Sequence, residues 1–169
     1  VPEQGIQADL ATVKGLVEEK EYFKALYLLE IMPENIESAA LKYQCKLEVS
    51  ENSAIRYFDV IQEKYRGDEQ YPAVMESIMH LVLDSDLRTD AVIKNGLDAA
   101  ERLLRSGRNG DYRVHEAMGI LCYRYGESFK RKGVQALENS IPAAKMNRVG
   151  DDVIKHLEEQ VKIYREKLD

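Results

Sequence analysis

The 169-residue sequence predicts an all-α protein in which helical hairpins are stacked side by side. Apolar residues recur at the three- and four-residue spacing of a helix along most of the chain. The 4 prolines and 10 glycines lie mostly between these runs, and β-branched residues never alternate with polar ones as they do in strands. A hydrophobic content of 44% and a charged content of 32% are typical of a folded, helix-rich chain.

One pattern of paired helical runs occurs twice between residues 10 and 61. In each copy, a helical run is followed by a short polar break and then by a second helical run. The second run opens around a small residue, Ala25 or Ala54. A large apolar residue follows four positions later, at Leu29 or Phe58. This spacing lets two helices approach closely while the next turn fills the groove beside them, so it predicts paired helices.

The first four helices are predicted from their apolar faces and from the residues at their ends. We expect them over about residues 6–19, 21–32, 36–49 and 53–66. The second helix carries Phe23, Leu26, Leu29 and Met32 on its apolar face and stops before Pro33. Asn35 is an N-cap residue for the third helix. SENS at 50–53 separates the third and fourth helices, and Gly67 ends the fourth as a left-handed C-cap residue.

The next helices are expected over about residues 72–83, 89–106 and 111–131, with a short eighth helix from Gly133 to near Ser140. Pro72 fits the first turn of the fifth helix, whose apolar residues surround it almost completely and predict a central position. Gly107 closes the sixth helix and Asp111 caps the seventh. Gly133 separates the seventh helix from the eighth, and residues 141–152 are expected to be irregular.

The last helix starts at Asp151 or Asp152 and has the clearest periodicity. Its apolar stripe comprises Val153, Ile154, Leu157, Val161, Tyr164 and Leu168, and charged residues cover the opposite face. A stack of helices needs such a terminal element, because its final apolar face would otherwise meet water. We therefore predict one domain over residues 1–169, with about four helix pairs over 6–140 and a capping helix over 151–168.

The paired helices, the small residue early in each second helix and a rhythm near 34 residues resemble the tetratricopeptide repeat family. Ala25, Ala54 and Ala91 match the small-residue position of three units, and Gly119 and Ala136 match the glycine and alanine of a fourth. The resemblance implies a right-handed α-solenoid with a curved surface that binds a protein or a peptide. Other right-handed α–α stacks and a plain helical bundle are the alternative folds.

The same resemblance assigns inward-facing positions to seven residues. They are Lys14, Val17, Tyr43, Lys46, His80, Tyr123 and Arg124. This mixture of bases, tyrosines and a histidine suits an extended partner segment that carries carboxylates and apolar side chains. The alternative for each residue is packing against a neighbouring helix. We expect an adaptor or scaffold without catalysis; the alternative is a chaperone that shields an apolar segment of a secreted or membrane-associated partner.

The charge is unevenly distributed. The net charge is −6, yet residues 100–149 contain 10 basic and 5 acidic side chains. This segment also holds aromatic residues that would stack on bases in a nucleic-acid interface, namely Tyr112, Tyr123, Tyr125 and Phe129. Their helical spacing indicates packing instead, and the acidic chain as a whole disfavours phosphate binding. We expect no nucleic-acid partner.

One cluster resembles a metal or proton-transfer site. Glu76, His80 and Asp84 lie one helical turn apart and share a face, which is the basis of a third hypothesis, a helical-bundle enzyme. Neither His115 nor His156 has matching surroundings, and no phosphate loop or nucleophile motif is present. We expect no enzyme, no metal and no cofactor.

The two cysteines, Cys45 and Cys122, lie inside apolar runs without zinc-ligand spacing. Buried thiols are expected, and a disulfide between them is the alternative. No apolar run is long enough to span a bilayer, so we expect no membrane insertion. The start at Val1 rather than Met suggests either a cut chain or a mature chain after signal removal. We expect a soluble protein of undetermined compartment, either cytoplasmic or exported with its signal removed.

Overall fold

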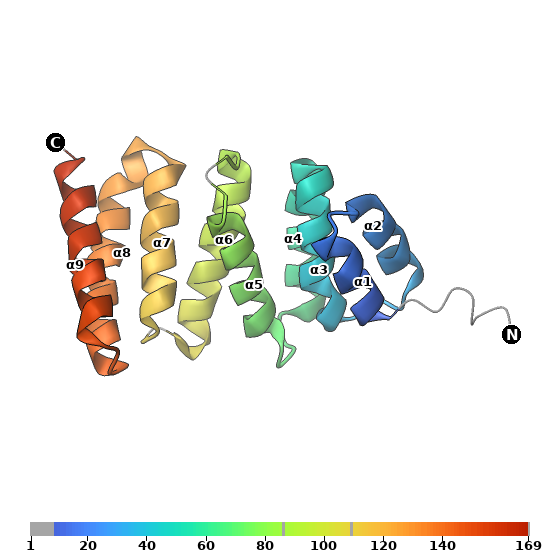
Figure 1. Ribbon diagram of the computed structural model, residues 1–169, viewed down its shortest axis with the longest axis horizontal. Coiled ribbons are helices and arrows are strands. Elements are labelled where there is room, and N and C mark those ends of the chain that lie inside the picture. Colours follow the sequence, from blue (N-terminus) through green and yellow to red (C-terminus); the bar gives the residue numbers. More distant parts are fainter. Residues whose placement is uncertain (1–8, 86, 109, 169) are drawn as a thin grey trace, which may run out of the picture. The chain divides into compact units, whose positions relative to one another are not determined.

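The computed structural model describes residues 9–85, 87–108 and 110–168, and the regular secondary structure in these ranges is entirely helical (Figure 1). The helices are α1 (Leu10–Glu18), α2 (Tyr22–Ile31), α3 (Ile36–Val49), α4 (Glu51–Tyr65), α5 (Tyr71–Leu83), α6 (Asp90–Leu103), a π-helical turn η2 (Leu104–Arg108), α7 (Tyr112–Tyr125), α8 (Glu127–Met146) and α9 (Asp151–Glu166). The all-α class is confirmed. The chain forms two compact units, Val1–Val74 and Met75–Asp169, and the predicted single domain stays a prediction.

In the first unit, each helix from α1 to α4 packs against the next, and α1 also contacts α3. The repeated small-and-large pairs are buried in both hairpins. Ala25 and Leu29 lie in a core cluster with Val13 and Val17. Close approach of paired helices therefore explains the pattern that the sequence repeats.

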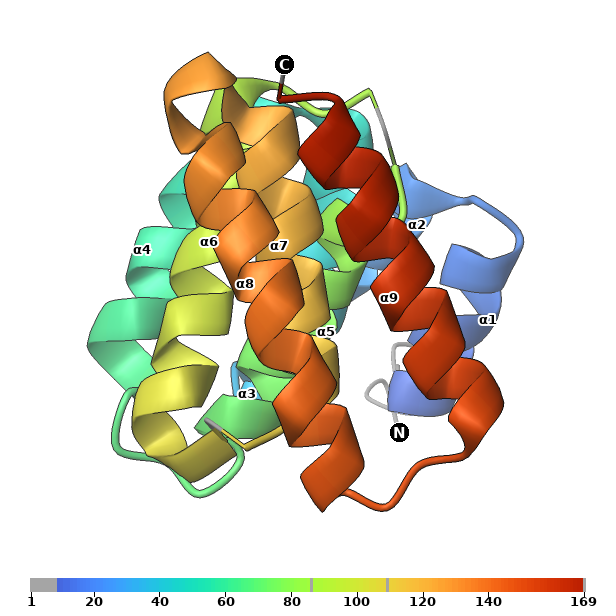
Figure 2. The same cartoon turned by 90° about the vertical axis from the view of Figure 1, so that its left-hand side faces the viewer.

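In the second unit, α6, α7, α8 and α9 also pack in chain order. Figure 1 shows α8 between α7 and α9, and Figure 2 shows α8 and α9 toward the viewer with α7 behind them. The tightest approach joins α7 and α8 through two glycines. A Cβ atom added to Gly119 would lie 2.5 Å from Leu137 Cγ and 2.7 Å from the Gly133 carbonyl oxygen. One added to Gly133 would lie 2.6 Å from the Gly119 carbonyl oxygen. Only residues without a side chain permit this contact.

Gly133 is therefore an interior residue of α8, and the prediction that it separates two helices is wrong. The seventh helix ends at Tyr125 rather than near residue 131, and the break falls at Gly126. The predicted short helix and much of the stretch expected to be irregular form one helix that continues to Met146. Pro142 is tolerated inside it because Pro142 is exposed while the two alanines that follow are buried.

Several predicted helix ends are confirmed. The Asn35 side chain accepts a hydrogen bond from the Ser38 backbone N–H at 3.1 Å, and Asp111 accepts one from Arg113 N–H at 3.0 Å. Pro72 lies in the first turn of α5, and α9 begins at Asp151. These polar caps satisfy backbone donors that the first turn of a helix leaves unpaired.

Other ends differ from the prediction. The fourth helix starts at Glu51, because Ser50 alone interrupts the helical backbone after α3. Gly67 follows the end of α4 without a left-handed backbone; among the described residues the glycines with positive φ are Gly107 and Gly126. The sixth helix ends at Leu103 and the turn η2 follows it, with helical backbone angles lost at Ser106 and Gly107. Gly107 has a left-handed φ of 96°, so the prediction that it closes this helical segment is confirmed. The first begins at Leu10 with Asp9 as its cap, and residues 6–8 lie outside the described residues.

The small residue predicted for the third hairpin is also different. Ala91 is exposed, so it does not mark a helix contact. The helix contact is at Gly96, which lies further along α6. A Cβ atom there would lie 2.9 Å from Val82 Cγ1 and 3.0 Å from Leu121 Cδ1. Because the small residues are irregularly spaced in the sequence, their spacing does not identify Gly96 as the contact residue.

Candidate binding surfaces

The seven residues predicted to face a partner belong to two different units. Four of them, Lys14, Val17, Tyr43 and Lys46, lie in the first unit, and His80, Tyr123 and Arg124 lie in the second. Each set is therefore described separately. A single groove that contains both sets stays a prediction.

In the first unit, two of the four predicted residues belong to the core. Val17 is buried in the cluster of α1 and α2, and Tyr43 is 0% exposed with its ring edge-to-face against Phe58 at 6.4 Å between centroids. A buried tyrosine of this kind stabilises the helix pair and has no surface for a partner. Lys14 is exposed, and the half-buried Lys46 places its ammonium 5.6 Å from the ring centroid of Tyr57.

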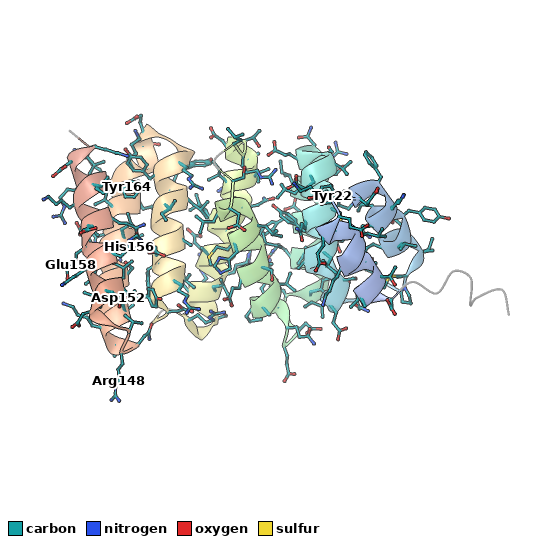
Figure 3. All side chains as sticks on the ribbon, in the orientation of Figure 1. Tyr22, Arg148, Asp152, His156, Glu158 and Tyr164 are labelled. Atoms are coloured by element: carbon teal, nitrogen blue, oxygen red, sulfur yellow. The ribbon has the colours of Figure 1, made fainter. Side chains whose placement is uncertain are left out.

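In the second unit, Tyr123 and Arg124 hold neighbouring segments together. The Tyr123 ring packs edge-to-face against Tyr164 of α9, which Figure 3 labels, with 4.7 Å between centroids. The ammonium of Lys130 lies 4.9 Å from the centroid of the same Tyr123 ring. Arg124 Nη1 donates a 2.9 Å hydrogen bond to the Leu83 carbonyl oxygen at the end of α5. Both side chains are thus engaged within the fold.

His80 is half exposed and lies beside a network of ion pairs around Glu76. Its Nε2 atom lies 3.9 Å from Glu76 Oε1, and Arg108 also binds Glu76 and reaches Asp111 at 2.6 Å. The hydrogen bond from Arg108 holds the pKa of Glu76 below its usual range, so Glu76 stays ionised as a structural partner. Within the described ranges, no group of three His, Cys, Asp or Glu side chains is placed to hold a metal ion.

The densest charge cluster of the first unit surrounds Glu34. Its carboxylate lies 2.8 Å from Lys64 Nζ and 3.9 Å from Lys42 Nζ, and it accepts a 3.3 Å hydrogen bond from the Tyr57 hydroxyl. Lys42 is buried and lies 3.4 Å from a second carboxylate, that of Glu30. The hydrogen bond from Lys64 lowers the pKa of Glu34. These contacts join α2 and the connection that follows it to α3 and α4, so the cluster has a structural role.

An apolar hollow on the surface of the first unit lies on α1 and α2. Leu16, Phe23, Tyr27 and Leu28, with Lys24 beside them, line a shallow hollow of about 440 Å³. We call these five residues the α1–α2 patch. Phe23 is 76% exposed and Tyr27 is 65% exposed. Two exposed aromatic rings in one apolar hollow are typical of a surface that binds another molecule.

No family model matches the chain, and no curated protein or solved structure matches it either.

The sequence pattern predicts Phe23 on the apolar face of its helix, and this prediction is wrong because Phe23 is exposed. The buried face of α2 is instead formed by Ala25 and Leu29, and Phe23 and Tyr27 lie one turn apart on another side. The signal was present in the sequence YFKALYLLEI, because a helix that is apolar nearly all round cannot bury every side chain in one small hairpin.

The two cysteines are free and buried, as expected. Burial raises the pKa of the Cys45 thiol to about 11 and also raises that of Cys122, so both remain protonated near neutral pH. Among the described helices, none is both long enough and apolar enough to cross a bilayer.

Proposed function

We propose that the protein is a binding module for another protein or a peptide, and that it acts as an adaptor or scaffold without catalysis. The observation that carries this proposal is the α1–α2 patch with its two exposed aromatic rings. The consecutive packing of α1 to α4 and of α6 to α9 supports a tetratricopeptide-like repeat stack as the scaffold. Binding energy would come from a surface that already exists in the free protein.

The patch is large enough to anchor a partner. A buried aromatic side chain removes about 150–250 Å² from water, and Phe23 and Tyr27 retain most of this area in the free protein. At about 25 cal/mol per Å², covering each ring would contribute about 3 kcal/mol before the costs of association are subtracted. Two adjacent anchors of this kind are typical of the residues that dominate protein–protein binding.

The structure favours an apolar partner segment over a purely acidic one. Of the bases predicted to contact carboxylates, Lys46 lies against the Tyr57 ring and Arg124 binds the Leu83 carbonyl. Lys24 lies at the edge of the patch, 3.8 Å from Glu21 Oε2, and its exposed ammonium can also pair with a carboxylate beside an apolar segment. We therefore propose an apolar segment with a flanking acidic residue as the ligand.

The test is a comparison of patch and control variants. The protein and its variants are purified from the cells that make the protein. We expect the double variant Phe23→Ser, Tyr27→Ser to recover at least tenfold less of the copurifying partner than the unmodified protein does. Leu87→Ser is the matched control, because Leu87 is 92% exposed and lies outside the patch. Circular dichroism confirms that each variant folds. Equal recovery of the same partner by both variants would reject the patch as the binding surface.

A second candidate function is a chaperone that shields apolar segments, and the apolar character of the patch favours it. A chaperone would suppress the aggregation of a model unfolded protein such as reduced lysozyme, and the double variant would not. An adaptor would leave that aggregation unchanged while retaining one discrete partner. Comparing the unmodified protein with the double variant in this aggregation assay therefore distinguishes a chaperone from an adaptor.

A further inference from the structure

A second, more enclosed cavity lies in the second unit, where α6, α7 and α8 meet. Its volume is about 140 Å³. Its apolar wall is formed by Leu97, Met118, Cys122, Tyr125 and Phe129. None of these residues belongs to the α1–α2 patch, so an inference from this cavity does not rest on the proposed function.

The wall of the cavity has the chemistry that favours an aromatic guest. Two sulfur-containing side chains, Met118 and Cys122, line it, and sulfur packs favourably against aromatic rings. Tyr125 and Phe129 already adopt the preferred edge-to-face arrangement, with 4.6 Å between centroids and an interplanar angle of 88°. A guest ring placed against these two would gain the same kind of contact.

The rim of the cavity is charged but balanced. Lys94 Nζ lies 3.8 Å from Asp98 Oδ1, and Lys132 Nζ lies 3.7 Å from Glu101 Oε1. Two bases therefore face two acids, and neither sign prevails. A charged guest would lose hydration without gaining a matching field, whereas a neutral guest avoids this cost.

We propose that this cavity binds one neutral aromatic ring. Its volume agrees with that of the guest, because an engineered, closed apolar cavity of about 150 Å³ in another protein holds one benzene molecule. Here the apolar wall takes the ring, and the side of the charged rim is open. The ring can be that of a free small molecule or that of a phenylalanine side chain. These two sources share the same chemistry, and different probes distinguish them.

The experiment uses methionine methyl groups as reporters in the full chain. The chain has five methionines, of which Met118 lines the cavity and Met146 is exposed on α8. Toluene is titrated into protein labelled with ¹³C at the methionine methyls. We expect the Met118 signal to shift and saturate, because a bound ring changes the magnetic field around it, while Met146 stays unchanged. No shift of Met118 up to the solubility limit of toluene would overturn the proposal.

A variant that fills the cavity tests whether toluene binds there. In Leu97→Phe the larger side chain occupies the space, so the toluene-dependent shift should disappear. Leu16→Phe, in the α1–α2 patch, is the matched control and should retain the shift. An unchanged shift in Leu97→Phe would overturn the proposal. If that variant fails to fold, Tyr125→Ala replaces it and should bind toluene about tenfold more weakly, because one ring of the wall is lost. Unaltered affinity in Tyr125→Ala would also overturn the assignment.

Two further probes define the guest. Methylcyclohexane, which has a similar size but no aromatic ring, should bind about two- to tenfold more weakly than toluene. Equal affinity for both would overturn the preference for a ring. Competition with toluene by N-acetylphenylalanine amide would assign the site to a peptide side chain, and failure to compete would assign it to a free aromatic molecule.

Discussion

Replacing Gly119 by alanine tests the close contact of α7 and α8. The new Cβ atom would lie 2.5 Å from Leu137 Cγ and 2.7 Å from the Gly133 carbonyl oxygen. Carbon atoms in contact are normally about 3.5–4.0 Å apart, so the two helices would have to separate by about 1 Å. The oxygen belongs to the backbone of α8 and cannot move away by a change of rotamer. The strain must therefore be relieved by moving a helix.

The magnitude follows from two opposing effects. Overpacking a well-packed site typically costs about 1–3 kcal/mol, and the backbone obstacle places Gly119 at the upper end of this range. Alanine is favoured over glycine inside a helix by about 1 kcal/mol, which offsets part of the cost. We expect Gly119→Ala to lower the free energy of unfolding by about 2 kcal/mol.

The assay is urea unfolding followed by the helical signal in circular dichroism. Gly15→Ala is the matched control, because Gly15 is also helical and a Cβ atom there would meet no heavy atom within 4 Å. In the control, helix propensity alone should raise the free energy of unfolding by about 0.5–1 kcal/mol. A Gly119→Ala protein as stable as the unmodified chain would refute the close approach of α7 and α8.

Three further changes test other contacts. Lys42→Ala should lower the free energy of unfolding, measured by urea titration, by about 1–3 kcal/mol. Lys64→Ala removes an exposed partner and should lower it by less; the reverse order would contradict the structure. Burial raises the pKa of Glu116, so its ionisation costs stability above the unfolded value of about 4.3. Glu116→Gln should therefore unfold at a higher temperature at pH 7 and lose this advantage below about pH 4, and an advantage that persists at low pH would exclude this cause. Cys45 and Cys122 should resist iodoacetamide at pH 8 in the folded protein and react in denaturant, as mass spectrometry can show; rapid modification of the folded protein would contradict their burial.

Much of the helix order could be predicted from local signals. The caps at Asn35 and Asp111 and the start of α9 depend on residues within one turn, and these predictions are confirmed. The break between α7 and α8 could not be predicted in the same way. A glycine such as Gly133 disfavours a helix locally, yet here it permits a helix contact that only the folded chain contains.

The binding residues were harder to predict than the helices. Helical spacing identifies which residues share a face, but the neighbours of that face decide whether it is buried. The sequence predicts Tyr43 at a partner surface, but Tyr43 lies in the core. It predicts Phe23 on the buried face of its helix, but Phe23 lies on the surface. Both outcomes depend on how neighbouring helices rotate about their axes, which a single helix does not determine.

The most direct test of partner binding is photo-crosslinking in the cells that make the protein. A photoreactive phenylalanine analogue replaces Phe23 in the α1–α2 patch or Met146, which is 83% exposed on α8. If the patch binds a protein, position 23 should form a discrete covalent adduct with it, and position 146 should not. Equal adducts at both positions, or none at position 23, would contradict the proposed function.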